Sequence, residues 1–323
     1  MPVHAFIFPG QGSQAVGMGR DLAAAFAAAR EVFAEVDDTL SQRLSKLMFE
    51  GPSDELTLTE NAQPALMAVS LAVVRVLEHE GGFKLADKAT LVAGHSLGEY
   101  SALAAAGAFS VAEAARLLRL RGQAMQHAVA PGVGAMAALL GVEMAQAAEI
   151  CAEAAETTTE DGRILHEIVQ SANDNGGGQV VISGHKGAVE RAIEIAKSKG
   201  VKRAMLLPVS APFHCALMEP AAQAMAEALA SATINAPVVP VVANVSAAKA
   251  TSADEIRDFL VRQVTGTVRW RESVLAMAGI GVDHFVELGS GKVLAGLVRR
   301  IAPEAGTVSA GNPAEIEALL KLL

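Results

Sequence analysis

Residues 89–106 of the chain read ATLVAGHSLGEYSALAAA. The apolar run over 89–93 is typical of a buried strand, and the alanine-rich run over 99–106 is typical of a helix. Between them, Gly94-His95-Ser96-Leu97-Gly98 matches the G-x-S-x-G pattern of a nucleophile elbow, a sharp turn that exposes a serine hydroxyl. The pattern alone is common in turns, but its place between a strand and a helix favours Ser96 as a nucleophile.

The segments around this elbow alternate between strands and helices. A short apolar run over 3–8, closed by Pro9-Gly10, predicts a buried strand that ends in a loop. Helices are expected over 21–40, over 63–80 with Pro64 in its first turn, and from a capping box at Ser110 and Glu113 to about 127. After residue 209 we expect helices over 218–231, 253–263, 271–278 and 292–301, and strands over 238–243 and 284–288. This alternation indicates an α/β fold.

A different pattern lies between these two parts. From Gly134 the order is a strand over 135–142, a helix over 144–156, strands near 164–172 and 179–183, a helix over 188–199 and a strand over 202–209. The order βαββαβ is the ferredoxin-like arrangement. We therefore expect a small subdomain over 132–207, inserted into a larger α/β subdomain formed by 1–131 and 208–323.

Composition excludes several classes of protein. The 323 residues carry a net charge of −9 without a clustered basic run, which argues against nucleic acid as a partner. Two cysteines are too few for a disulfide framework or a cysteine-rich zinc site, so a reducing cytoplasm is the expected location. No apolar stretch is long enough for a membrane span, and the N-terminus lacks the pattern of a signal peptide.

A serine nucleophile needs a base, and His214 is the leading candidate. It lies in Ser210-Ala211-Pro212-Phe213-His214, an irregular stretch after an expected strand, where catalytic side chains often collect. A single loop histidine is nevertheless more often an ordinary surface residue. His95 adjoins the nucleophile, but adjacent side chains diverge, so we interpret it as a packing or supporting group.

Arg121 falls on the apolar stripe of the helix that starts at Ser110, whereas Arg116 and Arg119 fall on another stripe. Such an arginine can extend its charged end to water. The alternative is a carboxylate partner, because an unpaired buried guanidinium costs on the order of 3–5 kcal/mol. The sequence leaves these alternatives open.

Three other patterns resemble nucleotide or metal sites but do not meet the requirements of such sites. A glycine-rich run at 132–137 follows a helix instead of a strand, and Gly289-Ser290-Gly291-Lys292 lacks both ends of the Walker pattern. Asp283, His284 and Glu287 lack a further ligand nearby, so no metal is predicted.

Six motifs in order resemble the malonyl-CoA:acyl carrier protein transacylases over nearly the whole chain. They are Phe8-Pro9-Gly10-Gln11-Gly12-Ser13-Gln14, the elbow with Glu99-Tyr100-Ser101-Ala102-Leu103, Arg121-Gly122, Asn173-Asp174-Asn175 with 179–184, 210–214, and Glu287-Leu288-Gly289-Ser290-Gly291-Lys292-Val293-Leu294. The turn Asn173-Asp174-Asn175-Gly176-Gly177-Gly178 departs from the Asn-Ser-Pro pattern of that family.

The resemblance implies an acyltransferase with an α/β-hydrolase-like large subdomain, stand-alone as in bacterial type II fatty acid synthesis. Ser96 would take malonyl from malonyl-CoA and pass it to the thiol of holo acyl carrier protein, with His214 as the base. The resemblance also implies roles for other residues. The backbone N–H groups of Gln11 and Leu97 would form an oxyanion hole, and the main-chain carbonyl of Gln263 would orient the base. Arg121, Phe213 and Asn175 would bind the substrate.

The resemblance implies no cofactor, and we expect a monomer. A serine esterase or thioesterase would share the serine and the base but would not need a buried arginine. A non-catalytic domain would have lost Ser96 or His214, and neither is lost. The sequence cannot distinguish a transacylase of fatty acid synthesis from one of a polyketide pathway. Basic residues at Lys186, Arg191, Lys197, Lys199, Lys202 and Arg203 could receive an acidic carrier protein, or could form a solvated helix face.

Overall fold

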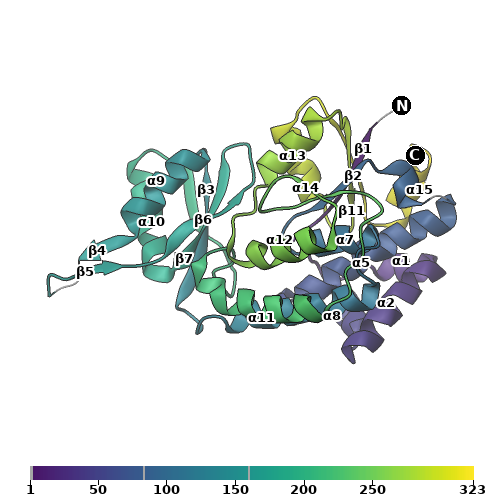
Figure 1. Cartoon of the computed structure of the whole chain (residues 1–323), viewed down its shortest axis with the longest axis horizontal. Coiled ribbons are helices and arrows are strands. Elements are labelled where there is room, and N and C mark those ends of the chain that lie inside the picture. The colour runs from purple at the N-terminus through teal and green to yellow at the C-terminus, as the bar shows by residue number, and fades with distance from the viewer. Residues whose placement is uncertain (1–2, 83, 159–160) are drawn as a thin grey trace.

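The computed structural model describes residues 3–82, 84–158 and 161–323 of the chain. They form a large α/β body and a smaller sheet with its own two helices (Figure 1). Within these residues no helix has the length and apolar character needed to span a membrane.

A six-stranded sheet forms the centre of the large body, in the order β10-β9-β2-β1-β11-β12. All neighbouring strands are parallel except the edge pair β9 and β10. The strands are β1 (His4–Phe8), β2 (Leu91–Gly94), β9 (Val241–Val242), β10 (Lys249–Ala250), β11 (His284–Leu288) and β12 (Gly306–Ala310).

Helices cover both faces of this sheet. Side chains alternate between the faces along each strand, and the apolar side chains on each face pack against helices. Phe6 and Phe8 of β1 point into the larger core, whereas Ala5 and Ile7 pack with α13 and α14 on the other face. The helices are α1 (Arg20–Ala25), α2 (Ala27–Leu40), α3 (Leu44–Glu50), α4 (Ser53–Thr57), α5 (Thr59–Gly81), α6 (Leu85–Lys88), α7 (Gly98–Ala105), α8 (Val111–His127), α11 (Glu219–Ser231), α12 (Ala253–Thr265), α13 (Trp270–Gly279), α14 (Val293–Ile301) and α15 (Pro313–Leu320), with a short 3-10 turn η1 (Ala216–Met218).

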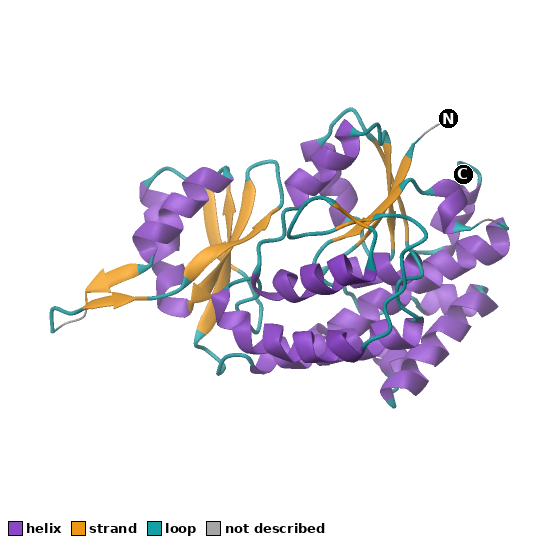
Figure 2. Cartoon of the chain, viewed as in Figure 1, coloured by secondary structure: helices purple, strands orange, loops and turns teal. Residues whose placement is uncertain are grey.

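The smaller sheet is antiparallel, in the order β6-β7-β3-β8, and packs on α9 and α10 (Figure 2). Along the chain these elements follow the order βαββαβ, with the hairpin of β4 and β5 added after α9. The elements are β3 (Gly134–Leu140), α9 (Met144–Ala154), β4 (Glu156–Thr158), β5 (Ile164–His166), β6 (Val169–Asp174), β7 (Gln179–His185), α10 (Lys186–Ser198) and β8 (Arg203–Leu206).

Several sequence predictions of local structure were wrong. The helix expected over 21–40 is interrupted at Phe26, whose extended backbone ends α1 and starts α2. Pro64 lies inside α5 instead of in its first turn, because the helix already starts at Thr59. The strand expected near 164–172 is divided into β5 and β6, and the one expected over 238–243 has only two residues, Val241 and Val242.

The end of β6 fastens the smaller sheet to the large body. Val268 donates from its N–H to the Ala172 carbonyl (2.9 Å) and accepts from the Asp174 N–H (2.9 Å). The buried Asp174 carboxylate also pairs with Arg271 Nε on α13 at 2.8 Å. These contacts hold β6 against the edge of the large body.

Candidate active site

Ser96 lies in the turn between β2 and α7, with φ of 53° in the left-handed region. The flanking glycines are required by close packing. A Cβ on Gly94 would lie 1.9 Å from the Gly98 carbonyl, and a Cβ on Gly98 would lie 2.2 Å from the Phe8 carbonyl oxygen. Strain at the nucleophile and glycine on both sides are the features of a nucleophile elbow, as the sequence predicts.

The loop after β1 lies directly against this elbow. A Cβ on Gly10 would lie 2.6 Å from the His95 carbonyl oxygen, and the His95 N–H donates to the Phe8 carbonyl at 3.1 Å. In the described part of the chain, the backbone N–H groups of Gln11 and Leu97 donate to no protein acceptor. Gln11 lines the cavity in front of Ser96, whereas the Leu97 side chain is buried and does not line it.

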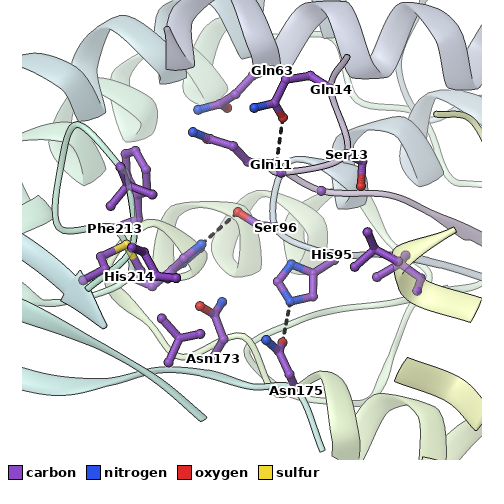
Figure 3. Close-up of a pocket in the computed structure, with 18 of the residues that line it drawn as sticks. Gln11, Ser13, Gln14, Gln63, His95, Ser96, Asn173, Asn175, Phe213 and His214 are labelled. Carbon is purple, nitrogen blue, oxygen red and sulfur yellow. Dashed lines mark hydrogen bonds between the residues drawn. The ribbon is translucent and has the colours of Figure 1, made fainter. Parts of the chain in front are cut away.

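His214 faces the nucleophile, and its Nε2 lies 2.8 Å from Ser96 Oγ (Figure 3). Its Nδ1 lies 2.8 Å from the backbone carbonyl of Gln263 on α12. Because a carbonyl only accepts, Nδ1 carries the proton and the Nε2 lone pair points to the serine hydroxyl. Burial, followed by the positive charge of Arg121, lowers the pKa of His214 to about 3, so its imidazole is neutral at pH 7.

Arg121 is fully enclosed, with a relative exposure of 1%, so its charged end does not reach water. Its Nη1 donates to Gln63 Oε1 at 2.7 Å, and its Nη2 donates to Gln263 Oε1 at 2.9 Å and to Ser96 Oγ at 3.2 Å. Among the described residues no carboxylate forms an ion pair with it, and its buried Nε has no partner. A cation beside the nucleophile whose direct hydrogen-bond partners are all neutral is suited to an anionic ligand.

Close helix packing places Arg121 there. A Cβ on the next residue, Gly122, would lie 2.5 Å from the Glu60 Cα of α5, so only glycine lets α8 approach α5 this closely. Arg119, expected on the other stripe of α8, is half-buried and bonds to Asn61 Oδ1 at 3.1 Å and to Gln42 Oε1.

Sequence reasoning missed a polar network beneath the elbow. Asn244 Oδ1 accepts from the Ser96 N–H at 2.7 Å, and Asn244 Nδ2 donates to the Gly94 carbonyl at 2.7 Å. The buried Glu99 Oε2 accepts from the Asn244 N–H at 3.0 Å and from Gln263 Nε2 at 2.7 Å. Asn244 follows β9 at the carboxyl end of a parallel strand, and this position was the signal that could have identified it.

The remaining predicted site residues line a cavity of about 430 Å³ in front of Ser96. Phe213 adjoins the base, and Asn175 lies on the opposite wall, where its Oδ1 is 2.9 Å from His95 Nε2 (Figure 3). His95 also packs against Trp270 with ring centroids 5.7 Å apart, in agreement with a supporting role. The smaller sheet contributes to the walls together with the large body, because Met136 and Val181 of that sheet line the same cavity. No cluster of three or more metal-ligating side chains occurs within the described ranges.

Comparison with known proteins defines the class. A family model described as the acyl transferase domain matches residues 5–305, so this protein is an acyltransferase. The malonyl CoA-acyl carrier protein transacylase of Escherichia coli K12 is 48% identical to the chain, over the full length of both proteins (100% and 100%). The enzyme of the same name from Bacillus subtilis is 45% identical, over 99% of this chain and 96% of its own length. The chain belongs to the malonyl CoA-acyl carrier protein transacylase family.

Solved structures agree with this assignment. An acyl-carrier-protein S-malonyltransferase from Bartonella henselae superposes with a TM-score of 0.94 at 56% identity, covering 99% of both chains. A malonyl-transacylase solved in complex with a type II PKS acyl-carrier protein superposes with a TM-score of 0.93 at 43% identity, covering 99% of this chain and 100% of that one.

Proposed function

We propose that the enzyme transfers malonyl from malonyl-CoA to the phosphopantetheine thiol of holo acyl carrier protein, through a malonyl ester on Ser96, for fatty acid synthesis. The observation that carries this proposal is the buried Arg121 guanidinium, 3.2 Å from Ser96 Oγ and held by neutral partners. Its two-pronged geometry matches the free carboxylate of a malonyl group. A serine esterase or thioesterase of uncharged acyl groups would have no use for it.

The first half-reaction uses the neutral His214 as a base. It takes the proton of the Ser96 hydroxyl while Oγ attacks the thioester carbonyl. The backbone N–H groups of Gln11 and Leu97 receive the negative charge that forms on the carbonyl oxygen. The C–S bond then breaks, and the coenzyme A thiolate leaves with the proton held by His214.

The second half-reaction is the reverse with another thiol. His214 takes the proton of the carrier thiol, whose sulfur attacks the malonyl ester, and returns it to Ser96 Oγ. The base is held by the Gln263 carbonyl instead of a carboxylate, which suits this chemistry because a thiolate is a good leaving group. Phe213 fills the cavity wall beside the base, where it would disfavour a branched acyl group, and Asn175 keeps His95 in place.

The adduct on Ser96 is the direct test. Brief mixing with malonyl-CoA is expected to add one malonyl group to the intact protein, because the hydroxyl, base and arginine are already in contact. Intact-protein mass and peptide mapping locate the adduct, and a carrier thiol is expected to remove it. An unmodified protein, or an adduct on Cys151 or Cys215, would reject Ser96 as the nucleophile.

Carrier binding needs a basic surface, because this enzyme and an acidic carrier repel each other overall. The basic residues at 186–203 are poor candidates, because four of the six are ion-paired: Lys186 with Glu190, Arg191 with Glu167, Lys197 with Glu194, and Lys199 with Glu153. Exposed Arg300 lines the cavity instead, bonded to the uncharged Gln179 Oε1 at 3.3 Å.

Arg300→Glu is therefore expected to raise KM for the carrier protein on the order of tenfold and to change KM for malonyl-CoA less. Steady-state kinetics with each substrate varied at two salt concentrations measures this. Lys197→Glu is the matched control, since Lys197 already pairs with Glu194 at 2.7 Å on the exposed side of α10. An unchanged carrier KM in Arg300→Glu would place the docking surface elsewhere.

We also propose that the chain divides into an α/β-hydrolase-like subdomain, 1–131 with 208–323, and a ferredoxin-like subdomain, 132–207, and that it works as a cytoplasmic monomer. The sheet order β6-β7-β3-β8 with α9 and α10 on one side supports the second description. The two free and buried cysteines are compatible with a reducing compartment.

A further inference from the structure

A buried carboxylate lies beneath the nucleophile without a direct ion pair. Glu99 on α7 is 2% exposed, and its Oε2 accepts hydrogen bonds from two neutral groups, the Asn244 N–H and Gln263 Nε2. The reaction steps above do not use this carboxylate. Burying a charge is costly unless another charge compensates it.

The compensating charge is Arg121, and one side chain links the two. The Gln263 carboxamide accepts from Arg121 Nη2 through its oxygen at 2.9 Å and donates to Glu99 Oε2 through its nitrogen at 2.7 Å. Each charge acts on the pKa of the other, the arginine lowering that of Glu99. In the unloaded enzyme, an ionised Glu99 and Arg121 therefore form a nearly neutral buried pair.

The other groups around Glu99 do not add charge. Tyr100, its neighbour on α7, is a phenol whose pKa burial raises, so it stays neutral. His214, bonded to the backbone of Gln263, is neutral as described above. Asn244 after β9 and Gln263 on α12 are amides. After burial and the hydrogen bonds from Asn244 and Gln263, Arg121 on α8 is thus the charged group that acts on Glu99.

We propose that Glu99 takes up a proton when Ser96 is loaded with malonyl and releases it when the carrier protein takes the malonyl group away. This inference rests on the proposed function. The malonyl carboxylate brings a second negative charge to Arg121, and two carboxylates that share one buried cation cannot both stay ionised at little cost. The malonyl group replaces Glu99 as the counter-charge of Arg121.

Glu99 is poised for this exchange near neutral pH. Burial raises its pKa to about 7 against the opposing effects of its hydrogen bonds and of Arg121, so a modest further change alters its charge. Glu287 offers a contrast, since burial also raises its pKa to about 7. Its carboxylate accepts from the N–H groups of Leu294 and Ala295 at the start of α14, and Arg121 does not contribute to its pKa shift, so loading should leave it unchanged.

The proton can be counted, because the acyl transfer itself balances. The Ser96 proton leaves with coenzyme A, and any additional proton comes from the solvent. In weak buffer at pH 7 with a pH indicator, acylation by malonyl-CoA is expected to take up on the order of half a proton per chain. Acetyl-CoA has no carboxylate, so its reaction is expected to cause no proton uptake. Any proton released by ionisation of the free coenzyme A thiol is the same for both donors.

The pH dependence has a defined sign. The malonyl-loaded enzyme binds more protons than the empty one, so raising the pH above 7 weakens malonyl relative to acetyl transfer. The ratio of the two kcat/KM values is expected to fall up to tenfold per pH unit until the loaded pKa is reached. In Glu99→Gln, which keeps an acceptor oxygen but no charge, the ratio is expected to be independent of pH and proton uptake to be absent.

Glu190→Gln on the exposed side of α10 is the matched control and is expected to retain both effects. Equal uptake with both acyl donors, or uptake that persists in Glu99→Gln, would overturn the inference. If Glu99→Gln does not fold, the wild-type difference between the two donors decides. A missing malonyl adduct on Ser96 would instead reject the proposed function, so the two failures are distinguishable.

Discussion

His214→Ala is expected to slow the acylation of Ser96 by roughly 10²- to 10⁴-fold, the usual loss when a general base is removed. The imidazole is the proposed acceptor of the serine proton, with Nε2 at 2.8 Å from Oγ. Rapid-quench measurement of the acyl-enzyme gives this rate directly, free of the later step on the carrier.

The control is His95→Ala, which removes the other histidine that lines the cavity. Its ring contacts Asn175 and Trp270 and not the Ser96 hydroxyl, so a much smaller loss is expected in folded protein. Thermal unfolding of both variants separates activity from packing. Equal losses in two folded variants would show that the roles of the histidines are assigned wrongly.

The pH profile gives a second readout of His214. Only the neutral imidazole accepts a proton, and a pKa of about 3 keeps it neutral well below pH 6.5. Acylation by acetyl-CoA should therefore stay constant as the pH falls from 7 to about 5, whereas a base of ordinary pKa would lose activity below 6.5. In Arg121→Ala the pKa of His214 should rise, because a positive charge that opposes protonation is gone.

The sequence predicted those parts of the site that depend on local constraints. The elbow at Ser96 needs glycines within a few residues, and that requirement is visible in the chain itself. Arg121 was marked by the helical spacing of apolar residues on α8, which left open whether its charged end reaches water, and the structure shows it buried. The support of His214 could not be derived from residue types, because its partner is the main-chain carbonyl of Gln263, and it was expected only from the family resemblance.

The missed features depend on contacts far apart in the chain. Asn244 bonds to Ser96, 148 positions away, and Glu99 bonds to Asn244, 145 positions away. Strand β12 was also missed, because the run Gly306–Ala310 is half polar and becomes a strand through parallel pairing with β11. The break at Phe26 carries no glycine or proline signal. Tertiary packing decides such positions, and local preference does not.

Arg121→Ala is expected to change which acyl group the enzyme prefers. The malonyl carboxylate would lose its bidentate partner in an enclosed site, a cost of about 2–5 kcal/mol, or roughly 30- to 4,000-fold in kcat/KM. Acetyl-CoA has no carboxylate and escapes this penalty. The quantity to measure is the ratio of malonyl to acetyl kcat/KM, since it cancels any general damage to the site.

The ratio is needed because Arg121 also supports its neighbours. Its removal leaves the side-chain oxygens of Gln63 and Gln263 without their donor, and Gln263 holds the base, so both activities can fall together. Arg119 is unsuitable as a control, since it is half-buried and bonded to Asn61. Arg116→Ala serves instead, because its side chain is 57% exposed and pairs loosely with Glu113 on the same helix. If the ratio stays constant in Arg121→Ala, this arginine only supports the fold, and another group recognises the carboxylate.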